Sequence, residues 1–128
     1  MYKIERKDYG IKLTFDGFIA PEEMREYKAE FIQVLDLLPP KFGILSDMRM
    51  LKPLPTESQE ILSANPELTV DRVLRSATVL NSALVKLQTR RLANQWKLSD
   101  SKRYIDASTH ADWEKQAVDW IVHGVEPK

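Results

Sequence analysis

Alternating apolar and polar residues mark the beginning of the chain. Between residues 11 and 18, three apolar side chains alternate with polar ones: Ile11, Leu13 and Phe15. This period of two predicts a strand with one buried face, and the shorter run 2–7 is expected to form a second strand beside it. Gly10 stands between the two runs and can supply the positive φ of a tight turn. The two segments are therefore predicted to form a β-hairpin.

Apolar residues that recur every three or four positions predict four helices, which are expected over 21–38, 56–72, 82–97 and 110–122. Thr56 and Gln59 have the spacing of a capping box, in which a threonine hydroxyl and a glutamine side chain satisfy backbone donors. The second helix is therefore predicted to start at Thr56. Pro66 interrupts its pattern, and a second short helical piece is expected to follow Asn65.

Three further short runs are predicted to be strands, over 42–48, 73–80 and 102–107. They alternate with the predicted helices, and helical crossovers of this kind join parallel strands. The sequence therefore predicts an α/β fold in which 42–48 and 73–80 pair in parallel. Its central mixed, mostly parallel sheet would begin with the N-terminal β-hairpin and carry flanking helices, and residues 1–128 would form one domain. Six residues on these elements are predicted to be buried: Phe31, Leu35, Ile44, Val79, Leu87 and Trp120.

The composition is typical of a folded protein, with 43% hydrophobic and 30% charged residues in a chain of 128. The absence of cysteine excludes disulfides, thiol catalysis and cysteine-ligated metal sites. The N-terminus is polar and the apolar runs are short, so we expect neither a signal peptide nor an integral membrane segment. The predicted location is the cytoplasm.

The net charge is zero, but the charges are segregated along the chain. Residues 1–71 carry 9 Lys or Arg against 13 Asp or Glu, and residues 72–128 carry 10 against 6. Lys86 and Arg90 lie one turn apart on the predicted helix 82–97, which indicates a basic face. This face is either a solvated surface or a site for an anion or an acidic partner. Nucleic acid is not expected to bind, because the chain is neutral overall and lacks interleaved aromatic and basic residues.

Two residues at the end of the predicted strand 42–48 are candidates for ligand binding. Asp47 and Arg49 point to the same side by the period of two, so they could orient a ligand carboxylate or phosphate. The alternative is that the pair ties the end of the strand to its loop. Thr56 and Ser58 lie near a predicted helix start, where a hydroxyl either caps the helix or serves as a phosphorylation site.

Neither a metal nor a cofactor is predicted. The two histidines, His110 and His123, do not have the spacing of a metal site, and no glycine-rich motif that would hold a phosphate occurs. A catalytic nucleophile paired with a base is also not recognisable. The sequence therefore favours a binding protein over an enzyme.

Three stretches resemble the SpoIIAA-like branch of the STAS family, in particular its small stand-alone bacterial members of unassigned function: FGILSDMRMLKPLPTESQEIL, RSATVLNSALVKLQTRRLA and RYIDASTHADWEKQAVDWI. The resemblance implies a central mixed sheet with helices, and a relation to the lipid-binding CRAL-TRIO domains. It also implies action by protein binding, which in such relatives is switched by phosphorylation of the serine in an Asp-Ser motif. The corresponding stretch here is 54–58, which lacks Asp-Ser, so the resemblance does not extend to that switch.

Three functions remain open at this point. The preferred one is a non-enzymatic regulatory or interaction module that binds a protein partner or a small anionic ligand through the loop 47–58, Lys86 and Arg90. The first alternative is a lipid or small-molecule carrier, with an apolar pocket lined by four residues: Leu51, Leu54, Leu84 and Trp96. The second is a small enzyme that uses Asp47, Arg49 and Tyr104. Self-association into a homo-oligomer is left open.

Overall fold

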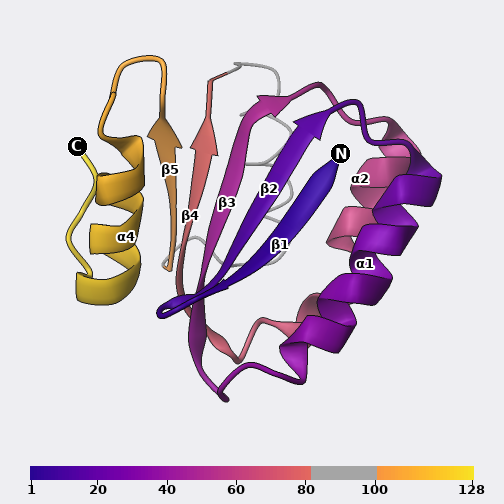
Figure 1. Cartoon of the computed structure of the whole chain (residues 1–128), viewed down its shortest axis with the longest axis horizontal. Helices are drawn as coiled ribbons and strands as arrows, with labels where there is room; N and C mark the ends of the chain where they lie inside the picture. The colour runs from indigo at the N-terminus through magenta and orange to yellow at the C-terminus, as the bar shows by residue number, and fades with distance from the viewer. Residues whose placement is uncertain (82–100) are drawn as a thin grey trace.

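The computed structural model describes residues 1–81 and 101–128 (Figure 1). The predicted helix 82–97, with Leu87 and the basic pair Lys86 and Arg90, lies outside these residues. The described elements follow one another in this order: β1 (Tyr2–Lys7), β2 (Gly10–Gly17), α1 (Pro21–Leu35), β3 (Phe42–Leu51), α2 (Thr56–Ser63), the 3₁₀ turn η1 (Pro66–Leu68), β4 (Val73–Leu80), β5 (Lys102–Asp106) and α4 (Trp113–His123). No helix among them is long and apolar enough to cross a bilayer.

The five strands form one mixed sheet in the order β1-β2-β3-β4-β5. β1 and β2 are antiparallel, and the predicted hairpin is confirmed. The pairs β2–β3, β3–β4 and β4–β5 are parallel, which confirms the predicted pairing of 42–48 with 73–80. Gly10 at the hairpin has a φ of +142°, and a Cβ there would lie 2.0 Å from the carbonyl oxygen of Gly43. Only a glycine therefore lets the hairpin meet β3 this closely.

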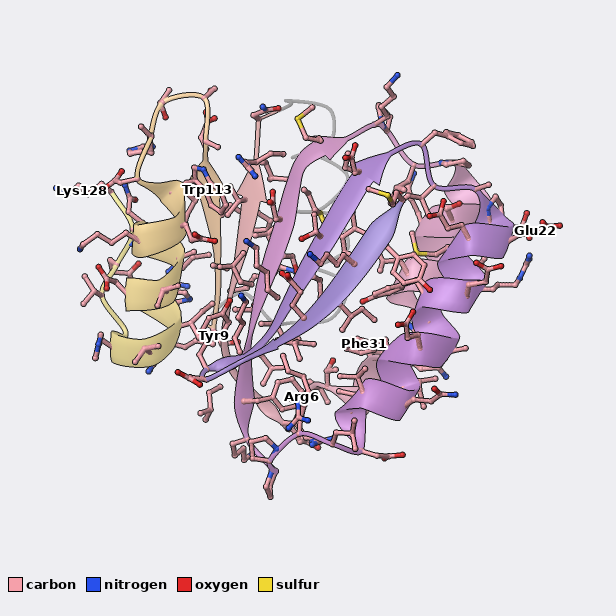
Figure 2. The ribbon with its side chains drawn as sticks, in the orientation of Figure 1. Arg6, Tyr9, Glu22, Phe31, Trp113 and Lys128 are labelled. Carbon is pink, nitrogen blue, oxygen red and sulfur yellow. The ribbon has the colours of Figure 1, made fainter. Side chains whose placement is uncertain are left out.

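Helices cover the two faces of the sheet unequally. Figure 1 shows α1 and α2 on one side and α4 on the other. The larger core lies under α1 and α2 and includes Leu13, Phe15 and Phe31, whereas α4 packs Trp120 and Ile121 onto β3, β4 and β5. Figure 2 shows Phe31 between α1 and the sheet and Trp113 at the start of α4. We call these the α1 face and the α4 face.

Four of the six residues predicted to be buried are confirmed, each being at most 7% exposed: Phe31, Leu35, Val79 and Trp120. Leu87 lies outside the described residues. Ile44 was predicted incorrectly, because its side chain is only half-buried and lines a cavity instead of the closed core.

The region after β3 differs most from the prediction. β3 continues to Leu51 instead of ending near Met48, because its last residues still pair with the end of β2. The capping box at Thr56 is wrong: the N-cap residue is Pro55, and the Gln59 amide donates to the Leu54 carbonyl at 3.0 Å. The predicted break before Pro66 and the second short helical piece after Asn65 are confirmed, but α2 already ends at Ser63 and the second piece, η1, ends at Leu68 and not near residue 72.

The break between α2 and η1 has a local cause. Asn65 has a left-handed backbone with φ of 60°, and Pro66 cannot donate the hydrogen bond that would continue a helix. The other two described helices are also shorter than predicted. α1 ends at Leu35 and not near residue 38, and α4 starts at Trp113 and not near residue 110.

Candidate functional site

A cavity of about 120 Å³ lies between the α1 face of the sheet and the segments α1, α2 and η1. Its walls are mostly apolar, and the main apolar residues come from strands and helices alike: Leu13, Phe15, Phe31, Ile44, Met48, Leu62 and Leu68. The segment 62–69, where α2 ends and η1 follows, supplies one side of the cavity. The residues that follow the early end of α2 therefore form part of the cavity wall.

Two of the four residues proposed for an apolar pocket line this cavity. Leu51 and Leu54 are both buried and contribute to its wall. The other two, Leu84 and Trp96, lie outside the described residues. The period of two along β3 explains the rest of this wall, since it brings Ile44, Ser46 and Met48 to one face.

Three polar residues that sequence reasoning did not place at a pocket also line the cavity: Ser46, Ser76 and Lys102. They sit on adjacent strands, and Ser76 pairs with Lys102 in the ladder between β4 and β5. Lys102 is half-buried, and burial lowers its pKa to about 8 because the ammonium is removed from water. Its position at the first residue of a short strand gave no signal in the sequence that it faces a cavity.

Lys28 also lines the cavity, and its ammonium is hydrogen-bonded to the backbone of the cavity wall. Its Nζ donates to the carbonyls of Ile61 and Leu62, at 3.3 and 3.2 Å, and to that of Ala64. These carbonyls lie in the last turn of α2 and just after it, where backbone acceptors lack the regular hydrogen bonds of a helix interior. Burial lowers the pKa of Lys28, as it does for Lys102. Lys28 therefore holds the end of α2 in place.

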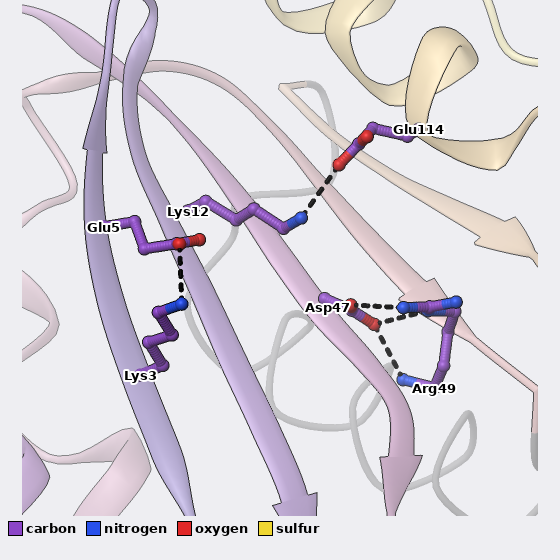
Figure 3. A network of polar contacts seen from close by, with 6 residues as sticks. All are labelled: Lys3, Glu5, Lys12, Asp47, Arg49 and Glu114. Atoms are coloured by element: carbon purple, nitrogen blue, oxygen red, sulfur yellow. Dashed lines mark hydrogen bonds and ion pairs between the residues drawn. The ribbon is translucent and has the colours of Figure 1, made fainter.

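Asp47 and Arg49 lie on the opposite, α4 face and bind each other (Figure 3). The Arg49 Nε and Nη2 atoms donate to the two Asp47 carboxylate oxygens at 2.9 and 3.0 Å. The Arg49 backbone N–H donates to the same carboxylate at 3.2 Å, where the register between β2 and β3 shifts. The hydrogen bonds that the Arg49 side chain donates to Asp47 raise the pKa of Arg49. The two ionised groups therefore pair with each other within β3.

The guanidinium of Arg49 also stacks on α4. Its central carbon lies 4.1 Å from the centre of the Trp113 ring. Lys12 forms an ion pair of 2.8 Å with Glu114, the residue that follows Trp113 (Figure 3). Asp47 itself is only 5% exposed. This arrangement supports the structural alternative for Asp47 and Arg49, although the pair joins the strand to α4 and not to its loop.

Thr56 and Ser58 differ in accessibility. Thr56 is exposed at the first turn of α2, whereas Ser58 is 0% exposed and its hydroxyl donates to the Ile19 carbonyl at 2.9 Å. Since α2 lies over the α1 face, the structure does not bring Ser58 together with Asp47 and Arg49. Lys86 and Arg90 lie outside the described residues.

A comparison with solved structures finds an uncharacterized protein of the DUF3478 family from Shewanella loihica PV-4, which has a SpoIIAA-like fold. The two chains superpose with a TM-score of 0.63 at 16% sequence identity, over 94% of this chain and 92% of the other. No family model matches the sequence, and a search of curated proteins gives no match. The resemblance found in the sequence is confirmed at the level of architecture: this chain has the SpoIIAA-like fold, a STAS-like α/β arrangement.

Proposed function

We propose that this domain is a non-enzymatic binding module that holds the apolar part of a small molecule in the cavity on the α1 face. The cavity is the observation that carries this proposal. Protein interiors are packed with few voids larger than a water molecule, so an apolar space of about 120 Å³ is a place where a ligand gains contacts without displacing a side chain.

The size of the cavity sets the size of the ligand. An apolar cavity of about 150 Å³ engineered into another protein stays dry and binds benzene. A space of about 120 Å³ accordingly suits a body of roughly one aromatic ring or a short branched chain. The carrier function that the sequence left open is thus narrowed from a lipid to a small molecule, for which we expect a Kd in the range of about 10 μM to 1 mM.

The site residues predicted from the sequence take other roles in this proposal. Asp47 and Arg49 hold α4 on the sheet, and Ser58 holds α2 against Ile19. Thr56 is an exposed group that a regulatory partner protein could contact, together with Lys86 and Arg90. Such a partner, self-association and a cytoplasmic location stay predictions from the sequence.

Toluene tests the proposal, because it has the size of the cavity and no charge. We expect it to shift the NMR signals of cavity residues and to raise the melting temperature, since a ligand of the folded state stabilises it. Ile44→Trp should fill the cavity and abolish both effects. The matched control is Ile32→Trp on the outer side of α1, where the isoleucine is 41% exposed and the extra volume enters solvent.

The outcome of this comparison decides the proposal. Binding by the wild type and by Ile32→Trp, but not by a folded Ile44→Trp, would support it. If millimolar toluene changes neither the spectra nor the melting temperature of the wild type, the cavity is not available in solution and the proposal is wrong.

A further inference from the structure

We infer that the ligand of this cavity is a small monocarboxylate whose head group pairs with Lys102. The inference rests on the proposed function and adds the chemistry of the polar end of the cavity. It starts from two rungs of the sheet on the α1 face. Ile44, Ser76 and Lys102 form one rung across β3, β4 and β5, and Ser46, Thr78 and Tyr104 form the next.

Lys102 differs from other lysines of the described chain in what surrounds it. Lys3, Lys12 and Lys115 each form an ion pair, with Glu5, Glu114 and Asp119 respectively. No carboxylate of residues 1–81 and 101–128 forms such a pair with Lys102, and burial alone accounts for its lowered pKa. The ring of Tyr104, centred 5.8 Å from the ammonium, is a weak substitute for an anion.

Further hydrogen-bond donors line the same cavity as Lys102. Ser46 and Ser76 place hydroxyls, which can donate hydrogen bonds, at the same cavity. On the adjacent rung, the Thr78 hydroxyl is buried without a hydrogen-bond partner among the described residues. Unpaired buried polar groups are costly, so an acceptor that none of the described residues supplies would be favourable beside these hydroxyls.

Among the described residues that line the cavity, Lys102 is the one cation left to pair with a ligand, which favours a monoanion. Lys28 faces the same cavity, but its ammonium already donates to two carbonyls of α2 and to that of Ala64, the next residue after the helix. A carboxylate would be neutralised by Lys102 alone, whereas a phosphate dianion would retain an uncompensated negative charge in apolar surroundings. An apolar body of one ring with a carboxylate head therefore matches both ends of the cavity.

The pairing predicts a dependence on pH. The titratable groups that face Lys102 at the cavity or beside it in the described chain are Tyr27 and Lys28 of α1 and Tyr104 of β5. In the free protein Lys102 loses its proton around pH 8, and a bound carboxylate would raise this pKa by favouring the ammonium. Carboxylate affinity should thus be highest below pH 8 and fall as the pH rises toward 10.

Phenylacetate and its neutral analogue phenylacetamide are the probes, with toluene measured in parallel by NMR titration. At pH 6.5 the wild type should bind phenylacetate at least tenfold more tightly than phenylacetamide, and the preference should vanish by pH 10. Lys102→Met should lose the preference at pH 6.5 while still binding toluene. Lys115→Met, an exposed lysine on α4, should behave as the wild type does.

The results separate this inference from the proposed function. If toluene binds the wild type but the two phenyl compounds bind equally, the carboxylate inference is wrong and the cavity function stands. If toluene does not bind, the proposed function fails. Tighter binding of phenylphosphonate than of phenylacetate would also overturn the choice of a monocarboxylate. If Lys102→Met does not fold, the pH series on the wild type decides, because a preference that persists at pH 10 contradicts a role for the ammonium.

Discussion

Ser58 and Thr56 lie two residues apart on α2, but a negative charge should have opposite consequences at the two positions. Ser58 is 0% exposed and donates to the Ile19 carbonyl at 2.9 Å, whereas Thr56 is exposed. We predict that Ser58→Asp destabilises the fold severely and that Thr56→Asp does not. The two variants together test which of the two hydroxyls can carry a phosphate without unfolding the protein.

The magnitudes follow from burial and hydrogen bonding. Ser58→Ala leaves the Ile19 carbonyl without its donor and should cost about 1 to 3 kcal/mol. Ser58→Asp adds the burial of a carboxylate at a fully buried position, and the penalty for such an ion is several kcal/mol. A small domain has roughly 5 to 15 kcal/mol in total, so much of the protein would be unfolded. Thr56→Asp, in the first turn of α2, should change stability by less than about 1 kcal/mol.

Urea unfolding followed by circular dichroism at equilibrium measures these differences, provided that the transitions are two-state with equal slopes. Thr56→Ala is the control for loss of the hydroxyl without added charge. The reasoning is refuted if Ser58→Asp unfolds within about 0.5 kcal/mol of Thr56→Asp, because Ser58 would then be accessible to water in the native state.

Two further predictions concern the sheet. Gly10→Ala should lower the free energy of unfolding by about 4 kcal/mol or more, since its Cβ would lie 2.0 Å from the Gly43 carbonyl oxygen. Gly17→Ala should lower it by only about 1 kcal/mol, because Gly17 has a φ of +70° but open space around it. Similar urea midpoints for the two variants would contradict this prediction. Arg49→Met should cost about 1 to 3 kcal/mol because it leaves the buried Asp47 carboxylate unpaired, and Asp47→Leu combined with Arg49→Met should recover most of the loss. Additive losses in that double-mutant cycle would show that the ion pair is not what holds the two residues.

The order of helices and strands could be predicted because each element shows its own spacing of apolar residues in the local sequence. The alternation in 11–18 and the three- and four-residue steps in 21–38 each report which side of an element is apolar, and this does not depend on the rest of the chain. The parallel sheet followed from the same pattern, since strands separated by helices return in the same direction. The resemblance to the SpoIIAA-like branch pointed to the same architecture.

Element ends were less predictable, because they depend on contacts between distant residues. The end of α2 is held by Lys28, which reaches carbonyls more than thirty positions later in the chain. β3 continues past Met48 because β2 offers it further partners. The spacing of Thr56 and Gln59 matches a capping box, but the Gln59 side chain donates a hydrogen bond to the Leu54 carbonyl instead.

In the candidate site, too, some features follow from the local sequence and others depend on contacts between distant residues. The sequence by itself brought Asp47 and Arg49 to one side of a strand, because the period of two is a property of the extended backbone. Only the tertiary structure decided that Asp47 and Arg49 satisfy each other against Trp113, and that Lys102 from β5 meets Ser76 at an apolar cavity closed by α1 and η1. The physical reason is that burial, and with it the energy of a charge, is set by every segment that excludes water from a point, and these segments lie far apart along the chain.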